Sequence, residues 1–319
     1  MDDTRRCDLV LGGGGIKGLA HLGVLAALDE RGYEVMRVAG ASAGALAGAL
    51  AVAGVGPEQA RRLSQELDYT GFAIADLVER FGSSRAIAAL LRRWTVEPTD
   101  PNAWIGEVLA EQGIETFADL RLDDDQASTG EEADYRLVVR CVDVLHRRVV
   151  RLPWDYARYG LDPDEQSVAE AVRASMSVPF VFDPVIVGDE PGTQGLLIDG
   201  GLTSGFAAAV LDRHDGAVPR WPTFAVRLLP RPRGEPRLPD SDREYAHMVA
   251  AALLDTGDLL EPTSACDERR TVRIDVSDVR ALEVNGIEDH DLLEEGARAM
   301  RAFLDDWDLD AYRRDCRGG

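Results

Sequence analysis

The sequence is short of residues on which several classes of binding protein depend. Lysine occurs only at Lys17, and the formal net charge of −22 argues against nucleic-acid binding and against electrostatic attraction to anionic membranes. The 4 cysteines show no C-x-x-C spacing, so neither a disulfide framework nor a zinc site is indicated. Calcium-loop patterns and metal-ligand clusters are missing too, and we expect no metal or other cofactor.

Long apolar runs are also missing. Residues 1–7 contain no hydrophobic signal core, and no stretch is apolar enough to predict a transmembrane helix. The uncharged segment 38–56 contains Gly44-x-x-x-Gly48, a pattern of packed membrane helices, but its alanines and glycines carry little hydrophobicity and favour a buried helix. With 45% hydrophobic residues in 319, the chain can bury a full core. We expect a cytoplasmic protein, with association to a membrane as an option.

Glycine, by contrast, is concentrated after the first expected strand. That strand, at 7–11, ends in Gly12-Gly13-Gly14-Gly15-Ile16-Lys17-Gly18, and the leucine spacing of 17–30 predicts a helix. Glycine lets backbone N–H groups converge, and a helix N-terminus favours an anion. Lys17, at the helix start, is expected to be solvated. The loop therefore offers donors for a developing negative charge, namely Gly13, Gly14 and Gly15.

A serine follows the second expected strand. The strand at 34–39 leads into Gly40-Ala41-Ser42-Ala43-Gly44, and the alanine-rich segment 45–53 continues as a helix. A strand, a sharp turn at serine and a helix form the nucleophile-elbow context that gives a G-x-S-x-G match its meaning. Ser42 is therefore the candidate nucleophile, and the N–H of Ala43 is a further candidate donor to an oxyanion.

A serine nucleophile needs a base, and the sequence favours an aspartate. In the segment 195–201 an apolar strand delivers Asp199 to the glycine pair Gly200 and Gly201. Because functional groups of open α/β sheets gather outside the strand ends, Ser42 and Asp199 can meet there. An aspartate that only caps its own turn is the structural alternative. The 5 histidines lie in no convincing motif: His21, His146, His214, His247 and His290.

Other functions fit parts of the same pattern. Gly13-x-Gly15-x-x-Gly18 also satisfies the dinucleotide fingerprint, but the second strand lacks the acidic residue expected for the ribose and runs into the serine. A Walker loop is disfavoured because no Ser or Thr follows the lysine and its glycine. A Ser-His-Asp esterase, with His247 or His290 as base, is the competing enzyme. A lipid-binding protein without catalysis is the alternative from another class.

Together these motifs resemble those of the patatin-like phospholipases, lipid acyl hydrolases with a Ser-Asp dyad. Residues 13–18 are similar to the G-G-G-x-[K/R]-G motif of that family, 40–44 to its G-x-S-x-G and 199–201 to its D-G-[GA], in the same order. Lys17, Gly18, Gly40, Gly44, Gly200 and Gly201 support these motifs. Further similarity lies at 173–180, 255–258 and 270–274, so the resemblance spans about residues 7–303.

The resemblance implies a fold and an organisation. We expect a three-layer α/β/α fold with a mostly parallel central sheet, in one domain over 1–319. Its core would cover about 7–303, with a helical insert at about 57–116 and a loose C-terminal tail at 307–319. Independently of the family, the alternation at 135–142 and 147–152 predicts a hairpin, and 291–304 predicts a last amphipathic helix.

The resemblance also implies an activity. Ser42 would attack the acyl ester of a glycerophospholipid or lysophospholipid, Asp199 would take its proton, and Gly13, Gly14, Gly15 and Ala43 would line the oxyanion hole. The implied partner is the lipid substrate, with peripheral membrane contact and without nucleic acid or metal. Two surface loops are also expected, at 121–134 and, rich in proline, at 231–237. Residues 67–74 are a candidate for a mobile lip of an acyl groove, with aromatic residues packed in a helical layer as the structural alternative.

Overall fold

The computed structural model describes most of the expected core. The described residues are 5–56, 101–122, 135–179, 182–190, 192–203, 208–213, 218–229, 264–276 and 291–317, with isolated positions elsewhere. Several predictions from the sequence lie outside them and are not taken further, namely the lip at 67–74, the Pro-rich loop at 231–237, the similarity at 255–258, most of the helical insert at about 57–116, most of the loop at 121–134, and His214, His247 and His290.

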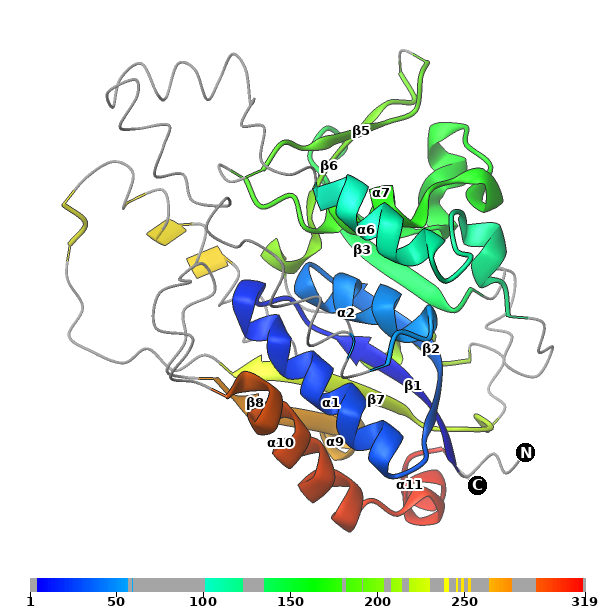
Figure 1. Ribbon diagram of the computed structural model, residues 1–319, viewed down its shortest axis with the longest axis vertical. Coiled ribbons are helices and arrows are strands. Elements are labelled where there is room, and N and C mark those ends of the chain that lie inside the picture. Colours follow the sequence, from blue (N-terminus) through cyan, green and yellow to red (C-terminus); the bar gives the residue numbers. More distant parts are fainter. Residues whose placement is uncertain are drawn as a thin grey trace.

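Within the described ranges, an eight-stranded sheet forms the centre of the molecule (Figure 1). Its order is β5-β6-β3-β2-β1-β7-β8, with β4 paired to β3. The pairs β1–β2, β1–β7, β2–β3 and β7–β8 are parallel, whereas β4, β5 and β6 join by antiparallel pairing, so the predicted hairpin is confirmed as β3–β4. The strands are β1 (Arg6–Leu11), β2 (Glu34–Ala41), β3 (Leu137–Asp143), β4 (Arg148–Leu152), β5 (Val185–Val187), β6 (Gly195–Asp199), β7 (Thr223–Leu229) and β8 (Thr271–Asp275).

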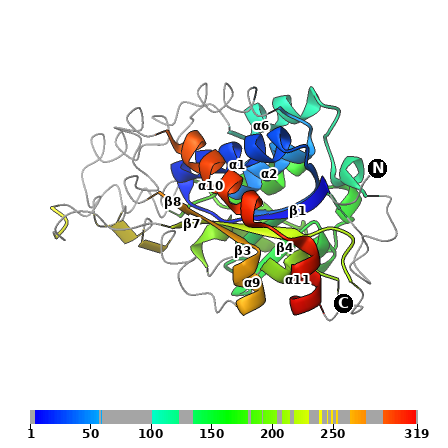
Figure 2. The same cartoon turned by 90° about the horizontal axis from the view of Figure 1, so that it is seen from below.

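Helices cover both faces of this sheet, as the α/β/α prediction requires. Figure 2 shows α1, α2, α6 and α10 on one side of β1 and β7, and α9 and α11 on the other. The last amphipathic helix is confirmed as α10, which Asp291 caps with its side chain. The helices are α1 (Leu19–Glu30), α2 (Ala43–Val52), α6 (Pro101–Ala110), α7 (Val168–Ser175), α9 (Ala265–Arg269), α10 (Leu292–Asp306) and α11 (Leu309–Cys316).

Glycine sets how closely the helical layer packs. A Cβ on Gly23 of α1 would lie 1.9 Å from the carbonyl oxygen of Leu293, and a Cβ on Gly296 of α10 would lie 1.9 Å from that of Ala20. The two helices therefore approach backbone to backbone through this pair of glycines. Because α1 begins directly after the glycine loop, this contact holds the start of α1 in place against the sheet.

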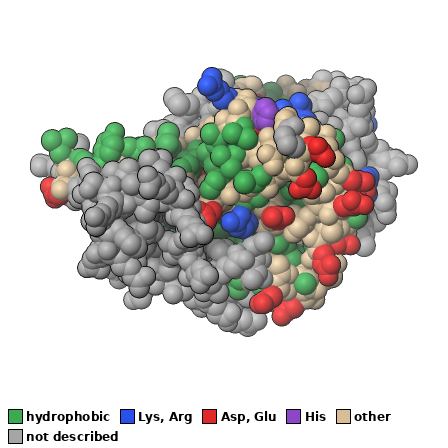
Figure 3. Space-filling model, turned by 90° about the horizontal axis from the view of Figure 1, so that it is seen from above, with side chains coloured by type: hydrophobic (Ala, Val, Ile, Leu, Met, Phe, Trp, Pro, Cys, Tyr) green, Lys and Arg blue, Asp and Glu red, His purple; other side chains and the backbone are tan. Residues whose placement is uncertain are grey.

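The antiparallel part of the sheet exposes apolar side chains. Figure 3 looks at the molecule from above and shows hydrophobic side chains clustered on that face. Val149 of β4 is 43% exposed and Ile186 of β5 is 67% exposed. In the turn between β3 and β4, Val144 and Leu145 are 44% and 59% exposed. Exposed apolar side chains that cluster in this way are typical of a contact surface.

Residues 307–317 are held in the fold, so the prediction of a loose tail at 307–319 is wrong over that range. Residues 309–316 form α11, and Cys316 makes a disulfide with Cys266 of α9. The ring of Trp307 packs against Phe224 of β7, with centroids 5.0 Å apart. The absence of a disulfide was likewise predicted wrongly. Because the two cysteines are separated by 50 positions, their pairing depends on tertiary structure and leaves no local spacing pattern.

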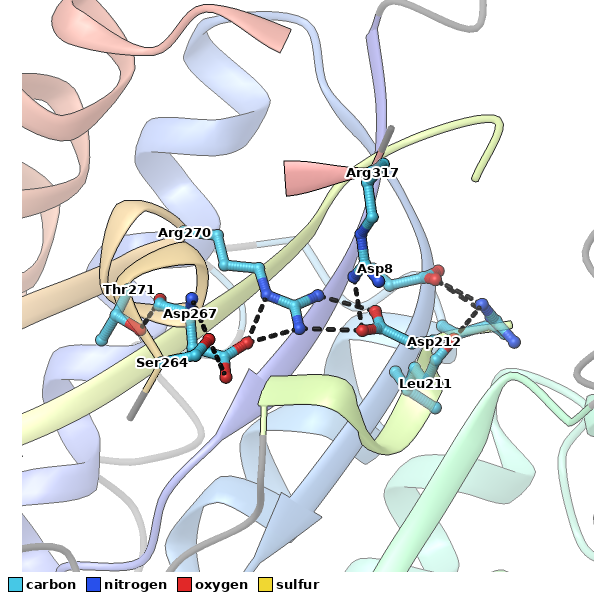
Figure 4. A network of polar contacts seen from close by, with 9 residues as sticks. Asp8, Leu211, Asp212, Ser264, Asp267, Arg270, Thr271 and Arg317 are labelled. Atoms are coloured by element: carbon cyan, nitrogen blue, oxygen red, sulfur yellow. Dashed lines mark hydrogen bonds and ion pairs between the residues drawn. The ribbon is translucent and has the colours of Figure 1, made fainter. Parts of the chain in front are cut away.

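A buried ion network fixes the same end of the chain (Figure 4). Asp212 accepts two hydrogen bonds from Arg270, at 2.6 and 2.8 Å, and also pairs with Arg317, which follows α11. Burial alone would raise the pKa of Asp212, but the hydrogen bonds and charges of the two arginines outweigh it and lower the pKa. Arg270 also donates to Asp267 of α9 at 2.6 Å. The network therefore ties α9 and the C-terminal residues to the segment around Asp212.

Candidate active site

Ser42 occupies the turn between β2 and α2 in a strained conformation. Its φ of 52° and ψ of −125° place a residue with a side chain at positive φ, which is costly unless the surroundings impose it. Two motif glycines make the turn possible. A Cβ on Gly40 would lie 2.3 Å from the carbonyl oxygen of Gly44, and one on Gly44 would lie 2.4 Å from that of Leu11. The geometry is that of a nucleophile elbow.

Asp199 ends β6 beside this turn. In the sheet register, β4 pairs along one edge of β3, and β2 and β6 lie end to end along the other edge, where Ala41 pairs with Arg140 and Asp199 with the next residue, Cys141. The antiparallel direction of β6 therefore brings its C-terminal residue to the carboxyl end of β2. Gly200 lets the chain turn there, since a Cβ on it would lie 2.0 Å from the carbonyl oxygen of Arg140.

Ser42 and Asp199 are in direct contact. The Ser42 hydroxyl donates to Oδ2 of Asp199 at 2.7 Å, and Oδ1 of Asp199 accepts from the backbone N–H of Gly201 at 2.6 Å. Ser42 is 3% exposed and Asp199 is 0% exposed. The structure thus brings together two residues that are 157 positions apart in the sequence.

Burial makes Asp199 a weaker acid than an ordinary aspartate. Removal from water raises the pKa of its carboxyl group to about 7, against the opposing effect of the hydrogen bonds from Ser42 and Gly201. A group with a pKa near the working pH is suited to accept and return a proton. The Nδ1 of His146 lies 2.7 Å from Oδ2 of Asp143, so this histidine is paired with a carboxylate other than Asp199.

The glycine loop lies against both residues. Gly14 has a φ of 146° and Gly15 a φ of 58°, values that favour glycine. A Cβ on Gly13 would lie 3.5 Å from Cβ of Ser42 and 3.1 Å from Cα of Gly201. Gly13 therefore lies beside the serine and the Asp-Gly-Gly turn, whereas a Cβ on Gly14 would meet Leu228 and Lys17.

Two supporting residues complete the contact between the loop and α2. A Cβ on Gly18 would lie 2.2 Å from Cβ of Ala43, so the two helix starts touch there. Ala43 is the first residue of α2, where backbone N–H groups have no partner within the helix. Lys17 was expected to be solvated, and this is wrong, since it is only 1% exposed. It lies in a tight 3-10 turn, Gly15–Gly18, that packs inside the fold before α1 begins.

Sequence reasoning missed a serine that orients the elbow. Ser175, the last residue of α7, accepts a hydrogen bond from the backbone N–H of Ser42 at 2.8 Å and donates to the carbonyl oxygen of Arg140 at 2.6 Å. It is 0% exposed. The segment 173–180 carried a family resemblance, but no local pattern assigns a role to one serine at a helix end.

Other features of the described residues concern metals and membranes. No group of three or more His, Cys, Asp and Glu side chains within the described ranges could hold a metal ion. Among the helices that the structure describes, none has the length and apolar character needed to cross a bilayer.

The fold and the serine elbow define an α/β protein with a Ser-Asp pair at the strand ends, and comparison with known proteins gives its family. The family model for patatin-like phospholipase matches residues 9–212. An uncharacterized protein of Bacillus subtilis (strain 168), YqhO, is 30% identical over 308 residues, which cover 94% of this chain and 98% of the relative. The chain therefore belongs to the patatin-like phospholipase family.

More distant similarities agree with this family. The uncharacterized NTE family protein MT2641 of Mycobacterium tuberculosis (strain CDC 1551 / Oshkosh) is 30% identical over 207 residues, which cover 65% of this chain and 28% of that longer relative. The crystal structure of VipD from Legionella pneumophila matches with a TM-score of 0.50 and 18% identity, over 94% of this chain and 67% of that chain. At that identity the structural match supports the fold.

Proposed function

We propose that the protein hydrolyses fatty acyl esters of glycerophospholipids or lysophospholipids, with Ser42 as nucleophile and Asp199 as base. The observation that carries the proposal is the 2.7 Å hydrogen bond from the Ser42 hydroxyl to the buried Asp199 carboxylate. Membership of a phospholipase family supports lipid hydrolysis in general. The acyl ester as the point of attack follows from the presence of a serine nucleophile beside a base.

The reaction proceeds in two halves. Oγ of Ser42 attacks the acyl carbonyl carbon while its proton passes to Asp199, and the tetrahedral intermediate then expels the alcohol, which takes the proton from Asp199. Water next attacks the acyl-enzyme, again giving its proton to Asp199, and Ser42 recovers that proton as the fatty acid leaves. The Gly13, Gly14, Gly15 and Ala43 N–H groups are proposed to bind the oxyanion, each donor contributing ~3–4 kcal/mol to the transition state.

The direct contact favours the dyad over a Ser-His-Asp triad. In a triad the serine hydroxyl donates to an imidazole, and the aspartate binds the other side of that imidazole. Here both carboxylate oxygens of Asp199 are engaged, one by Ser42 and one by Gly201. His247 and His290, the bases considered for a triad, lie outside the described residues.

Labelling by a fluorophosphonate probe separates an enzyme from a lipid-binding protein. We expect intact-protein mass spectrometry to show one adduct, located by peptide mapping at Ser42, and no adduct in Ser42→Ala. Asp199→Asn should label much more slowly because the hydroxyl loses its base. Asp189→Asn, an exposed aspartate in the loop after β5, is the matched control and should label like the wild type. Absence of labelling in the wild type would favour a binding function.

Contact with a lipid surface belongs to the same proposal. With a net charge of −22, the protein must reach a bilayer through apolar contact, which the exposed Leu145 and Ile186 offer. The double variant Leu145→Ser/Ile186→Ser should bind uncharged phosphatidylcholine vesicles more weakly in flotation assays. Its turnover of a soluble short-chain ester should equal that of the wild type. Equal vesicle binding by both proteins would show that the protein contacts lipid through another surface.

A further inference from the structure

A buried histidine lies directly beneath the glycine loop. His21, in the first turn of α1, is 0% exposed, and its Nε2 lies 2.9 Å from the carbonyl oxygen of Gly12. A carbonyl oxygen can only accept, so Nε2 carries the proton of the ring. Burial lowers the pKa of His21 to about 4, although the bond to Gly12 opposes this change. The imidazole is therefore neutral near pH 7, and Nδ1 is the unprotonated nitrogen.

The hydrogen bond from His21 to the Gly12 carbonyl orients the whole Gly12–Gly13 peptide. The carbonyl of Gly12 and the N–H of Gly13 belong to one planar trans peptide, in which the oxygen and the hydrogen point in opposite directions. The hydrogen bond that holds the Gly12 carbonyl oxygen toward α1 therefore also turns the Gly13 N–H away from α1. Gly13 is the loop residue whose Cβ position lies 3.5 Å from Cβ of Ser42.

This peptide needs an anchor because glycine lies on both sides of it. Glycine has few steric barriers, so a Gly-Gly peptide can rotate and present its carbonyl where its N–H should be. A carbonyl oxygen facing an oxyanion would repel it. The N–H of Gly12 is held by the carbonyl of Val226 in β7 at 3.3 Å, which fixes the preceding peptide. The carbonyl oxygen of Gly12, which belongs to the Gly12–Gly13 peptide, accepts its hydrogen bond from His21.

We infer that His21 is a positioning residue, whose Nε2–H holds the Gly12–Gly13 peptide so that the Gly13 N–H points toward the oxyanion formed at Ser42. The inference rests on the proposed function, since it assigns the oxyanion to that reaction. His21 takes no proton from Ser42 in this account, because Ser42 donates to Asp199 and the imidazole donates to the backbone. The orphaned Nδ1, which has no hydrogen-bond partner among the described residues, shows that the ring is held through Nε2.

Two substitutions test whether His21 acts by positioning the loop, by accepting a proton or only by filling space. His21→Leu removes the donor, and His21→Gln places an amide N–H near the position of Nε2. For a soluble short-chain ester, kcat of His21→Leu should fall roughly 10²–10³-fold, the effect of losing an oxyanion donor, with KM within about threefold of wild type. His21→Gln should recover kcat at least about tenfold over His21→Leu, because only the donor is restored.

A control and a spectroscopic readout make the result decisive. Val24→Ala, at a buried position of the same helix, should lower the melting temperature without the loss of kcat, which separates misfolding from misalignment. Imidazole ¹⁵N NMR should show His21 as the neutral Nε2–H tautomer down to about pH 5, whether or not substrate is turned over. Wild-type kcat in His21→Leu, no recovery in His21→Gln, or an Nδ1–H tautomer would overturn the inference. A wild type that turns over no ester but shows the Nε2–H tautomer would overturn the proposed function and leave the anchor in place.

Discussion

Asp199 is subject to two opposing requirements. In the proposed role of base, Asp199 must be ionised near neutral pH, yet it is fully buried, and burial disfavours its charge. Its only compensations among the described contacts are one hydroxyl and one backbone N–H, with no arginine of the kind that stabilises Asp212. The site therefore holds a carboxylate that destabilises the fold in its charged form, as functional residues often do.

This conflict predicts a pH-dependent gain of stability for Asp199→Asn. The folded-state pKa of about 7 lies above the ordinary 3.8, so the native state holds the proton more tightly than the unfolded chain, and stability falls as pH rises between these values. Removing the charge should therefore stabilise the variant by ~1–4 kcal/mol at pH 8 and by almost nothing at pH 4, as measured by urea unfolding. The exposed control Asp189→Asn should show no such trend. A variant less stable than wild type at pH 8 would contradict this explanation.

At the scale of elements, the local patterns predicted the motifs well. The strand ending in glycines, the strand ending at Ser42 and the strand ending at Asp199 are β1, β2 and β6, close to their expected bounds. What could not be predicted are contacts that depend on register, such as Ser175 beneath the elbow and His21 beneath the loop. A lone serine at a helix end and a lone histidine on an apolar helix look the same in sequence whether or not they support a site.

The backbone contact between α1 and α10 makes a prediction for Gly23→Ala. A Cβ there would lie 1.9 Å from the carbonyl oxygen of Leu293, so the helices must separate, which should cost roughly 1–3 kcal/mol of unfolding free energy. Because α1 also carries His21, we expect reduced turnover as well. Gly56→Ala is the matched control, since no atom lies within 4 Å of its Cβ position and its φ is ordinary. Equal urea midpoints for Gly23→Ala and Gly56→Ala would contradict the close approach of α1 and α10.

At the scale of the whole molecule, the C-terminal end closes the fold on both faces of the sheet, with Trp307 beside α10, and α11 on the face opposite α1. Its disulfide, its aromatic contact with β7 and the Asp212 network link segments that are far apart in the sequence. The sequence could not predict this closure, because ion networks and long-range disulfides leave no periodic signal. The expectation of a loose tail failed for the same reason, since the polar residues after Trp307 are held by partners elsewhere.

Removal of the disulfide should therefore weaken the whole fold. Cross-linking positions 50 residues apart restricts the unfolded chain, and Cys316→Ser should lower the unfolding free energy by ~2–4 kcal/mol. Dithiothreitol should lower the urea midpoint of the wild type to that of the variant and leave the variant unchanged. Fluorophosphonate labelling of Ser42 should persist in both proteins at 25 °C, because the cross-link lies away from the serine. An unchanged midpoint after reduction would show that the cross-link adds nothing.

The central claim is that Ser42 and Asp199 together hydrolyse a lipid acyl ester. The most direct measurement is fatty acid release from a panel of phospholipids and lysophospholipids between pH 5 and 9, for wild type, Ser42→Ala, Asp199→Asn and His290→Ala. We expect wild-type release to rise with pH to a plateau above about 7, as Asp199 ionises, with release abolished only by the first two substitutions. Full release by Asp199→Asn, or loss of release in His290→Ala, would contradict the dyad.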